Sequence, residues 1–400
     1  MSSSIFAAVE MAPRDPILGL NEAFTADPRT TKVNLGVGVY FDDNGKLPLL
    51  AAVKAAEEAR LKAAPARGYQ PIEGSAAYNQ AVQNLLFGAG SEIVSSGRII
   101  TAQALGGTGA LKVGADYLKR LLPQAKVYIS DPSWENHRAL FEAAGFTVEN
   151  YPYYDPSTRG VNFAAMKACL AGLQPGSIII LHACCHNPTG ADISDAQWEE
   201  VVVVCRERGL VPFLDMAYQG FADGIDADAV AVRAFVNSGL QFFVSSSFSK
   251  SFSLYGERVG ALSVVTASKE EAGRVMSQVK RVIRTNYSNP PTHGGAIVAA
   301  VLASPELRQM WEAELAGMRD RIRAMRVGLA DQLRAKGLSF DFVNQQRGMF
   351  SYTGLTADQV EKLKSEFGIY AVSSGRICVA ALNSKNLGYV TDAIANVAKN

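Results

Sequence analysis

Short apolar runs recur between residues 97 and 265, and helical patterns separate them. The run Ile178–Leu181 contains no polar residue, as expected of a strand that helices cover on both faces. This alternation predicts an open α/β sheet, which binds its ligand at the carboxyl ends of its strands. The expected strands are Ile99–Gln103, Val127–Ser130, Ser177–Ala183, Val211–Leu214 and Gln241–Ser245, with helices from Gly107, from Trp134 and over Gln197–Arg208.

A chain of 400 residues is too long for one simple core. Residues from Pro305 to Lys336 form one long helical pattern that can connect two domains. Strand patterns at Ser339–Val343, Met349–Thr353 and Arg376–Ala380, with helical patterns at Thr356–Phe367 and Asn383–Lys399, predict a small α+β domain after it. We expect an N-terminal arm with part of the small domain (1–46), a large domain (47–316) and a small C-terminal domain (317–400).

Charge and cysteine content narrow the function classes. The 39 Lys and Arg residues balance 38 Asp and Glu residues, so no net charge favours nucleic acid or an anionic membrane. The five cysteines have no regular spacing, which argues against a disulfide framework. The first residues lack a basic region, and no uncharged apolar segment of about 18 residues exists to span a bilayer. We expect a cytoplasmic protein whose partners are small molecules and its own copies.

One lysine stands among small hydroxyl residues directly after a buried strand. Lys250 lies in the stretch Ser245–Gly260, which follows the apolar run Leu240–Val244 and ends near Arg258. Apolar surroundings destabilise a charged amine and leave a nucleophile that condenses with aldehydes. Schiff-base chemistry is therefore one reading of Lys250, and a solvated lysine in a serine-rich loop is the other.

Three more strand ends carry candidate site residues. The sequence Gly106–Gly109 passes from a strand into a helix, so its backbone N–H groups and Thr108 can hold a phosphate, or it is a plain tight turn. It matches neither the dinucleotide fingerprint nor the Walker pattern. Asp215 ends an apolar run, where a carboxylate either pairs with a cation such as a protonated pyridine nitrogen or caps a helix. Trp134 offers a flat surface for ring stacking, or it is a buried residue that opens a helix.

The segment His182–Gly190 contains two histidines and the adjacent Cys184 and Cys185, a combination that suggests a metal. Adjacent residues of a strand point to opposite faces, so we do not expect both thiols to bind one ion. Asn187–Gly190 is better explained as a tight loop that presents an amide at the sheet edge. Upstream, the glycine-interrupted strand Val33–Tyr40 is a candidate pocket wall, and Asp15-Pro16 predicts a helix start.

The order of these motifs resembles the pyridoxal-phosphate aminotransferases of fold type I. Within them, the chain is similar to the aspartate aminotransferase subgroup, which includes bacterial aromatic-amino-acid (tyrosine) aminotransferases. The resemblance runs nearly end to end and implies a large cofactor-binding domain with a mostly parallel seven-stranded sheet, plus a smaller α+β domain. The motifs that carry it are Asp15–Leu18, Val33–Tyr40, Gly106–Gly109, His186–Gly190, Asp215–Gly220, Ser249-Lys250 and Ser374–Arg376.

The resemblance implies roles around the cofactor. Lys250 would bind pyridoxal phosphate covalently and move the proton during catalysis. Asp215, supported by His137, would keep the pyridine nitrogen protonated. Tyr218 and Asn187 would hydrogen-bond the ring oxygen, and Trp134 would stack on the ring. The phosphate would be bound by Gly107, Thr108, Ser247 and Arg258.

The resemblance also implies how substrate binds. Arg376 would clamp the α-carboxylate, assisted by Trp134, Asn187 and the Gly38 backbone. Arg284 would reach from the neighbouring subunit to a side-chain carboxylate, and Tyr69 would cross likewise toward the phosphate. These two residues imply an obligate homodimer with shared active sites, in which the N-terminal arm lies on the partner.

The wording of Asp131–His137, Ser247–Arg258 and Gln346–Gly354 is closer to the aromatic enzymes than to the aspartate-preferring ones. We expect tyrosine and phenylalanine as amino donors, 2-oxoglutarate as acceptor to give glutamate, and some activity on aspartate. The alternative is aspartate as the main donor. Two other classes stay open: a β-eliminating pyridoxal-phosphate enzyme, and a non-catalytic module, against which the intact Lys250 and the lack of a DNA-binding segment argue.

Overall fold

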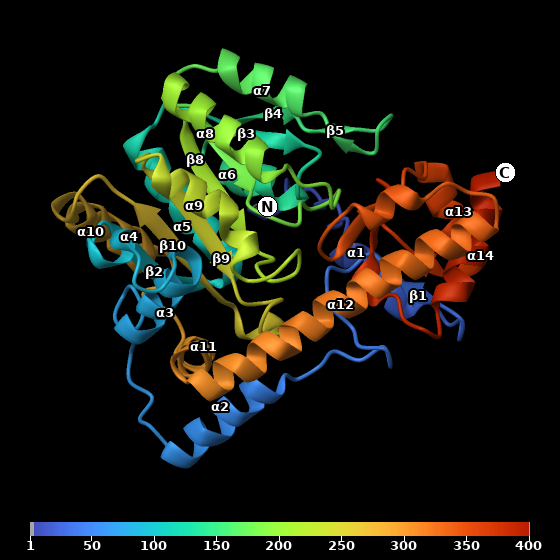
Figure 1. The fold of residues 1–400 in the computed structure, drawn as a ribbon, viewed down its shortest axis with the longest axis horizontal. Coiled ribbons are helices and arrows are strands. Elements are labelled where there is room, and N and C mark those ends of the chain that lie inside the picture. The colour runs from blue at the N-terminus through green and yellow to red at the C-terminus, as the bar shows by residue number, and fades with distance from the viewer. Residues whose placement is uncertain (1–3, 400) are drawn as a thin grey trace.

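A seven-stranded sheet forms the centre of the larger part of the chain (Figure 1). The computed structural model describes residues 4–399. The strand order is β2-β10-β9-β8-β7-β3-β4, and only β10 runs antiparallel to its neighbours, so the predicted mostly parallel sheet is confirmed. Its strands are β2 (Ile99–Leu105), β3 (Lys126–Asp131), β4 (Thr147–Pro152), β7 (Ile178–His182), β8 (Val211–Met216), β9 (Phe242–Ser247) and β10 (Val259–Val265).

Both faces of the sheet are buried, as the apolar runs predict. In β7, Ile178 and Ile180 belong to one hydrophobic cluster, whereas Ile179 and Leu181 belong to the other. Because alternate residues of a strand point to opposite faces, a wholly apolar strand requires helices on both sides. The helices of this part are α2 (Ala51–Ala63), α3 (Ala76–Phe87), α4 (Glu92–Ser95), α5 (Gly106–Leu121), α6 (Glu135–Ala143), α7 (Phe163–Gly172), α8 (Asp195–Arg208), α9 (Val230–Asn237), α10 (Lys269–Asn286) and α11 (His293–Ala303).

The carboxyl ends of the parallel strands meet at one edge of the sheet. The register aligns His182 of β7 with Asp215 of β8, and Asp215 with Ser245 of β9. On the far side of β10, β2 leads directly into α5 at Gly106. The strand ends that carry candidate residues in the sequence are therefore neighbours in space, as an open α/β sheet requires.

A single long helix, α12 (Pro305–Ala335), connects the two parts (Figure 1). It begins where Ser304 accepts the N–H of Leu307 and Pro305 occupies the first turn. In its first half, Trp311 donates its indole N–H to the carbonyl of Ser251 in the large part, over 2.7 Å. The predicted boundary at 316/317 lies inside this helix, and the division into three segments stays a prediction.

The smaller part contains two-stranded sheets and three helices. Its strands β11 (Phe350–Tyr352) and β13 (Arg376–Cys378) pair antiparallel, and β1 (Val33–Asn34) pairs parallel with β12 (Ile369–Tyr370). The C-terminal half of α12 packs with α14 (Leu387–Lys399), which also contacts α13 (Ala357–Phe367). A separate hairpin, β5 (Tyr154–Asp155) with β6 (Gly160–Val161), projects from the large part.

Two of the predicted strands are wrong in extent or type. The segment Ser339–Val343 forms no strand, and Asp341–Asn344 is a 3-10 turn after α12. The strand predicted over Val33–Tyr40 is limited to Val33–Asn34, because the chain leaves β12 beyond Tyr370 and turns toward the carboxyl edge of the large sheet. Helix α1 (Leu18–Ala26) begins later than Asp15-Pro16 predicts, although Asp15 still accepts the N–H groups of Ile17 and Leu18.

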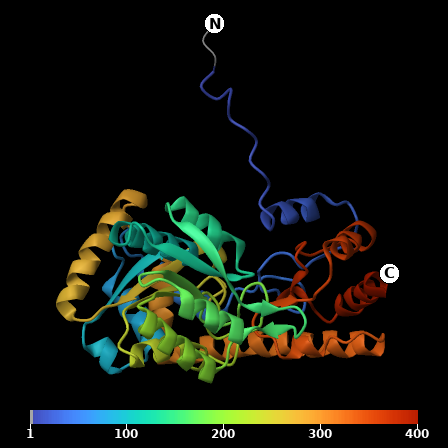
Figure 2. The ribbon, with the colours of Figure 1, turned by 90° about the horizontal axis from the view of Figure 1, so that it is seen from above.

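The segment before α1 extends away from both parts (Figure 2). It exposes large apolar side chains to solvent, among them Phe6 at 71% and Met11 at 96%. No helix among residues 4–399 is both long and apolar enough to cross a membrane.

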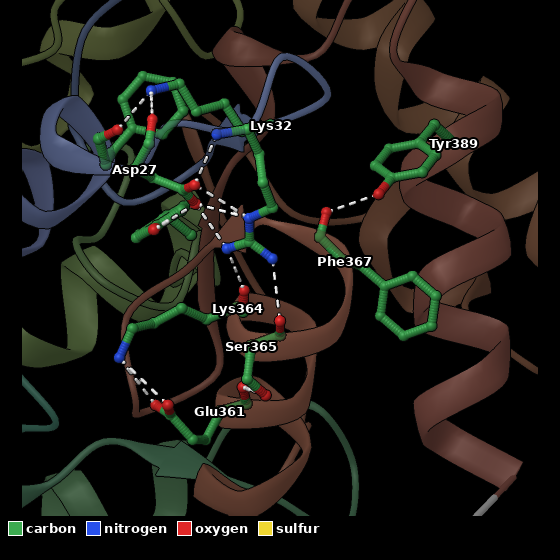
Figure 3. Close-up of polar contacts among 10 residues, drawn as sticks. Asp27, Lys32, Glu361, Lys364, Ser365, Phe367 and Tyr389 are labelled. Carbon is green, nitrogen blue, oxygen red and sulfur yellow. Dashed lines mark hydrogen bonds and ion pairs between the residues drawn. The ribbon is translucent and has the colours of Figure 1, made fainter.

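A polar cluster ties the chain after α1 to the smaller part (Figure 3). The Asp27 carboxylate accepts hydrogen bonds from the Arg29 guanidinium and from the hydroxyl of Tyr370 in β12. Arg29 also donates to the carbonyls of Lys364 and Ser365 at the end of α13, each over 2.9 Å. The hydrogen bonds from Arg29, and then that from Tyr370, hold the pKa of Asp27 well below its usual value.

We expect Asp27→Asn to lower the Tm of the protein at neutral pH. Because the carboxyl pKa is lower in the folded protein, its contribution is complete above the unfolded pKa of about 3.9 and is lost as pH falls below it. The Tm difference between wild type and variant should thus be constant from pH 7 to pH 5 and shrink below about pH 4. Thermal unfolding at several pH values checks this. The control is Asp226→Asn, which removes an exposed pair with Arg233 and should change little.

Candidate active site

A cavity of about 210 Å³ opens at the carboxyl edge of the sheet, between the two parts of the chain. It brings together all the predicted site residues except Tyr69 and Arg284. From the predicted set it is lined by Gly38, Gly107, Thr108, Trp134, Asn187, Asp215, Tyr218, Ser247, Lys250, Arg258 and Arg376.

Lys250 lies three residues beyond the end of β9 and points its amine into this cavity. Its Nζ is 4.9 Å from the centroid of the Tyr218 ring and has no hydrogen-bond partner within residues 4–399. Burial lowers the pKa of Lys250 to about 8; the charge of Asp215 opposes this shift and that of Arg258 adds to it. About half of the amine is therefore unprotonated, and nucleophilic, near pH 8.

A hydrogen-bonded chain stands beside the lysine. Asp215 is 6% exposed, and its Oδ2 lies 2.8 Å from Nε2 of His137, whose Nδ1 lies 2.9 Å from the Ser133 hydroxyl. Burial favours the neutral acid, but the hydrogen bond and charge of His137 outweigh it, and the pKa of Asp215 is below its usual value. The cavity thus contains a buried carboxylate that is ionised and available to a cationic group.

The next ring, His182, has no hydrogen bond to either nitrogen from the described residues. It packs 4.9 Å from His137 and 4.3 Å from His186, ring centre to ring centre. Burial, and then the neighbouring His137, lower the pKa of His182 to about 3, so it is neutral. His186 is also neutral, with its ring nitrogens on the hydroxyls of Ser130 and Thr189.

An anion site lies at the start of α5. This helix has no side chain that caps its first N–H groups, and Gly107, Thr108 and Arg258 all line the cavity there. Gly106 has a left-handed φ of 69°, which favours glycine, and a Cβ there would also lie 2.6 Å from Nη2 of Arg258. Uncapped N–H groups beside a guanidinium form a strong site for a phosphate.

A second cation, Arg376, faces the cavity from β13 and is 1% exposed. Its guanidinium donates to Oδ1 of Asn187 over 3.1 Å and to the carbonyl of Gly36 over 2.5 Å, while its Nε has no partner in the described chain. The ring of Phe350 lies under it, 4.4 Å from Cζ to the ring centre. A fixed guanidinium with free donors suits a carboxylate.

Two predicted site residues lie outside this cavity. Tyr69 is 97% exposed on the segment between α2 and α3. Arg284 is exposed near the end of α10, where it donates to the hydroxyl of Ser288. Within one chain neither side chain lines the cavity, so their roles stay predictions.

Several lining residues were missed by sequence reasoning: Ile17, Leu111, His182, Ala217, Ser249, Tyr255 and Phe350. Position in a motif could have indicated Ser249 and Tyr255, which belong to the same stretch as Lys250. His182 was considered only as a metal ligand. Ile17 and Phe350 lie within the motifs Asp15–Leu18 and Gln346–Gly354, but nothing local indicates that they reach the cavity from such distant parts of the chain.

The expectation that Cys184 and Cys185 point to opposite faces of a strand is wrong. The strand β7 ends at His182, and Cys185 has a left-handed φ of 53°, so the two residues do not alternate across a strand. Their thiols and a carboxylate oxygen of Asp228 lie within 4.8 Å of one another. Burial raises the pKa of the Cys185 thiol to about 11, so the thiol is protonated.

We expect the Lys250 amine of the cofactor-free protein to titrate near pH 8. Competitive acetylation across pH, read by peptide mass spectrometry, should show Lys250 reacting well below the ordinary lysine pKa of about 10.4. Asp215→Asn should move this midpoint lower still, because the carboxylate charge raises the pKa of the amine. A midpoint at the ordinary lysine value would contradict the burial argument.

The chain is similar to known proteins along nearly its whole length. The profile of the family described as aminotransferase class I and II matches residues 30–394. An aspartate aminotransferase of Pseudomonas aeruginosa is 67% identical over 396 residues, which cover 98% of this chain and 100% of that protein. The aromatic-amino-acid aminotransferase of Escherichia coli is 51% identical over 397 residues, with coverage of 98% and 100%.

The fold has a near match among solved structures. The crystal structure of an aromatic-amino-acid aminotransferase from Burkholderia pseudomallei, covalently bound to pyridoxal phosphate, superposes with a TM-score of 0.97. The two sequences are 68% identical, and the match covers 99% of this chain and 100% of that one. The chain therefore belongs to the class I and II aminotransferase family and is an aminotransferase of the aspartate and aromatic-amino-acid type.

Proposed function

We propose that this chain uses pyridoxal phosphate to transfer the amino group of tyrosine, phenylalanine and aspartate to 2-oxoglutarate, giving glutamate and a 2-oxo acid. The observation that carries the proposal is the meeting of three groups in one cavity: the Lys250 amine, the ionised Asp215 and the Arg376 guanidinium. An amine nucleophile, a buried anion and a carboxylate receptor are the groups that amino transfer needs.

The residues present fit pyridoxal phosphate. The start of α5, with Thr108, Ser247 and Arg258, suits its phosphate. Asp215 suits the protonated ring nitrogen, Trp134 offers a ring face, and Tyr218 and Asn187 are the cavity groups available to the ring oxygen. Lys250 supplies the amine for its aldehyde. The structural relative from Burkholderia pseudomallei, which holds this cofactor covalently, supports the same assignment.

When bound, the cofactor supplies an aldehyde that condenses with amines and a ring that accepts an electron pair. Once the substrate amine has replaced it, the free Nζ of Lys250 would take the proton from the substrate Cα and deliver it to the former aldehyde carbon of the cofactor. Asp215 keeps the ring nitrogen cationic, and His137 fixes that carboxylate through the 2.8 Å hydrogen bond. Arg376 orients the substrate through its α-carboxylate.

We also propose a homodimer with shared sites. The exposed Tyr69 would approach the partner's phosphate site, and Arg284 would contact a side-chain carboxylate there. The apolar side chains of the extended N-terminal arm, such as Phe6 and Met11, support burial on a partner. All five cysteines are free thiols, which supports a reducing, cytoplasmic location.

The main donor has two candidates. Three motifs resemble the aromatic enzymes, and the Burkholderia relative is named for aromatic amino acids. The Pseudomonas relative is named for aspartate, which keeps aspartate as the alternative principal donor. A donor-by-acceptor panel of kcat/KM values with tyrosine, phenylalanine and aspartate decides between them.

The first test is whether turnover needs an acceptor. The wild-type protein should form a 2-oxo acid continuously only when 2-oxoglutarate is present, whereas a β-eliminating enzyme would release ammonia without it. Lys250→Ala should fold and retain the cofactor non-covalently. Borohydride reduction should then add no mass to the peptide that contains position 250, and turnover should be nearly abolished. Near-normal transamination by Lys250→Ala would overturn the proposal.

The second test concerns Arg284 and the dimer. Arg284→Leu should reduce the stabilisation of the transition state by about 1.5–3 kcal/mol for aspartate and by much less for phenylalanine, because only aspartate has a second carboxylate. Mixing Arg284→Leu subunits with Arg376→Ala subunits should restore aspartate activity, since each heterodimer then has one intact site. Equal losses for both substrates would refute the pocket assignment, and no recovery would refute the shared site.

A further inference from the structure

Helix α12 contributes a buried arginine that lies outside the cavity but next to its wall. Arg326 is 2% exposed, in the half of α12 that packs in the smaller part. Its guanidinium donates to the carbonyls of Val343, Gly348 and Phe350 over 3.2, 2.7 and 2.6 Å, and to the hydroxyl of Ser351. Three of these acceptors belong to Gly348, Phe350 and Ser351, so Arg326 acts as a clamp on residues 348–351.

Although this guanidinium is buried, no carboxylate of residues 4–399 forms an ion pair with it. Burial lowers the pKa of Arg326 to about 10, so the fold bears the cost of desolvating the cation. A neutral side chain of similar volume would avoid that cost, but it could not donate to several carbonyls at once from a rigid fork. Arg326 therefore fixes the backbone geometry of residues 348–351.

The clamped segment supports the substrate side of the cavity. Phe350 follows Gly348 and Met349, and its ring lies 4.4 Å under the guanidinium of Arg376. The Phe350 ring also contacts Gly38. A Cβ added to Gly38 would lie 2.7 Å from Cζ of Phe350, so the ring packs directly against the Gly38 backbone. The ring therefore occupies one fixed position, between the Gly38 wall and Arg376.

The ring of Phe350 is a contact of Arg376 in addition to its hydrogen bonds. Arg376 has only two hydrogen-bond acceptors, Asn187 and Gly36, and its Nε has none within residues 4–399. The face of Phe350 supplies the remaining fixed contact, through a cation–π interaction that desolvation strengthens. Strand pairing adds a second link, since Phe350 and Tyr352 of β11 pair with Cys378 and Arg376 of β13.

We propose that Arg326 is a positioning residue for the amino acid's α-carboxylate: by fixing the Phe350 backbone it holds the ring that orients Arg376. This inference rests on the proposed function, because it takes Arg376 as the carboxylate receptor. It assigns part of substrate affinity to a residue that touches neither substrate nor cofactor.

The test is binding of 3-phenylpropionate to the cofactor-loaded protein. This probe has a carboxylate and a ring but neither an amino nor an oxo group, so it binds without reacting. In Arg326→Met its Kd should rise about tenfold, with partial recovery in Arg326→Lys. The KM for phenylalanine should rise in parallel, while the absorbance of the lysine-bound cofactor and its pH dependence stay as in wild type.

Arg321→Met is the matched control. Arg321 also lies on α12 and donates four hydrogen bonds, to the Tyr40 hydroxyl and to the carbonyls of Phe41, Ala380 and Leu382. Its replacement should lower the Tm comparably to Arg326→Met but leave the Kd of 3-phenylpropionate within about twofold of wild type. A purely structural role for Arg326 would make the two variants behave alike.

Other outcomes are also decisive. If Arg326→Met does not fold, Phe350→Leu keeps the backbone carbonyl for Arg326 and removes only the ring, and the same loss of affinity is expected. A folded Arg326→Met or Phe350→Leu protein that binds 3-phenylpropionate as wild type does would overturn the inference. A wild-type protein that binds the probe but does not transaminate would instead refute the proposed function, and the Kd comparison would still decide the role of Arg326.

Discussion

Burial of the central sheet on both faces is the constraint on which the rest of the structure depends. Strands such as β7 bury apolar side chains on both sides, so they cannot lie at a surface. Parallel strands then end together at one edge. That edge is where Asp215 and Lys250 can be held, out of bulk water yet facing a cavity.

The surroundings of each ionisable group in the cavity decide its charge state. Asp215 stays ionised because His137 donates to it, while Lys250 loses part of its charge because burial outweighs the nearby carboxylate. The uncapped start of α5 with Arg258, and separately Arg376, provide positive potential in the cavity. Under the proposed function, the first group would hold the cofactor phosphate and the second the substrate carboxylate.

The smaller part of the chain contributes rigidity as much as ligands. The polar cluster of Asp27, Arg29 and Tyr370 fixes the segment that leads to Gly36 and Gly38. The Arg326 clamp fixes the segment that carries Phe350. Both segments meet at Arg376, whose two acceptors come from different parts of the chain. Buried polar networks of this kind hold a receptor group in one geometry because every alternative leaves donors unsatisfied.

By itself the sequence determined the sheet class and the long connecting helix, because wholly apolar runs and helical periodicity are local signals. Motifs at strand ends indicated part of the cavity, and the resemblance to a known family supplied the rest. The sequence also placed Lys250, Asp215 and Arg376 on the right elements. Only the tertiary structure decided which distant residues complete the wall: Ile17 and Phe350 belong to recognised motifs, but no local pattern encodes a contact formed by packing. The same holds for Cys185, whose left-handed backbone departs from the strand alternation assumed from sequence. It holds also for Arg326: its spacing from Ile322 and Leu329 places it on the buried face of α12, but only packing decides which carbonyls it contacts.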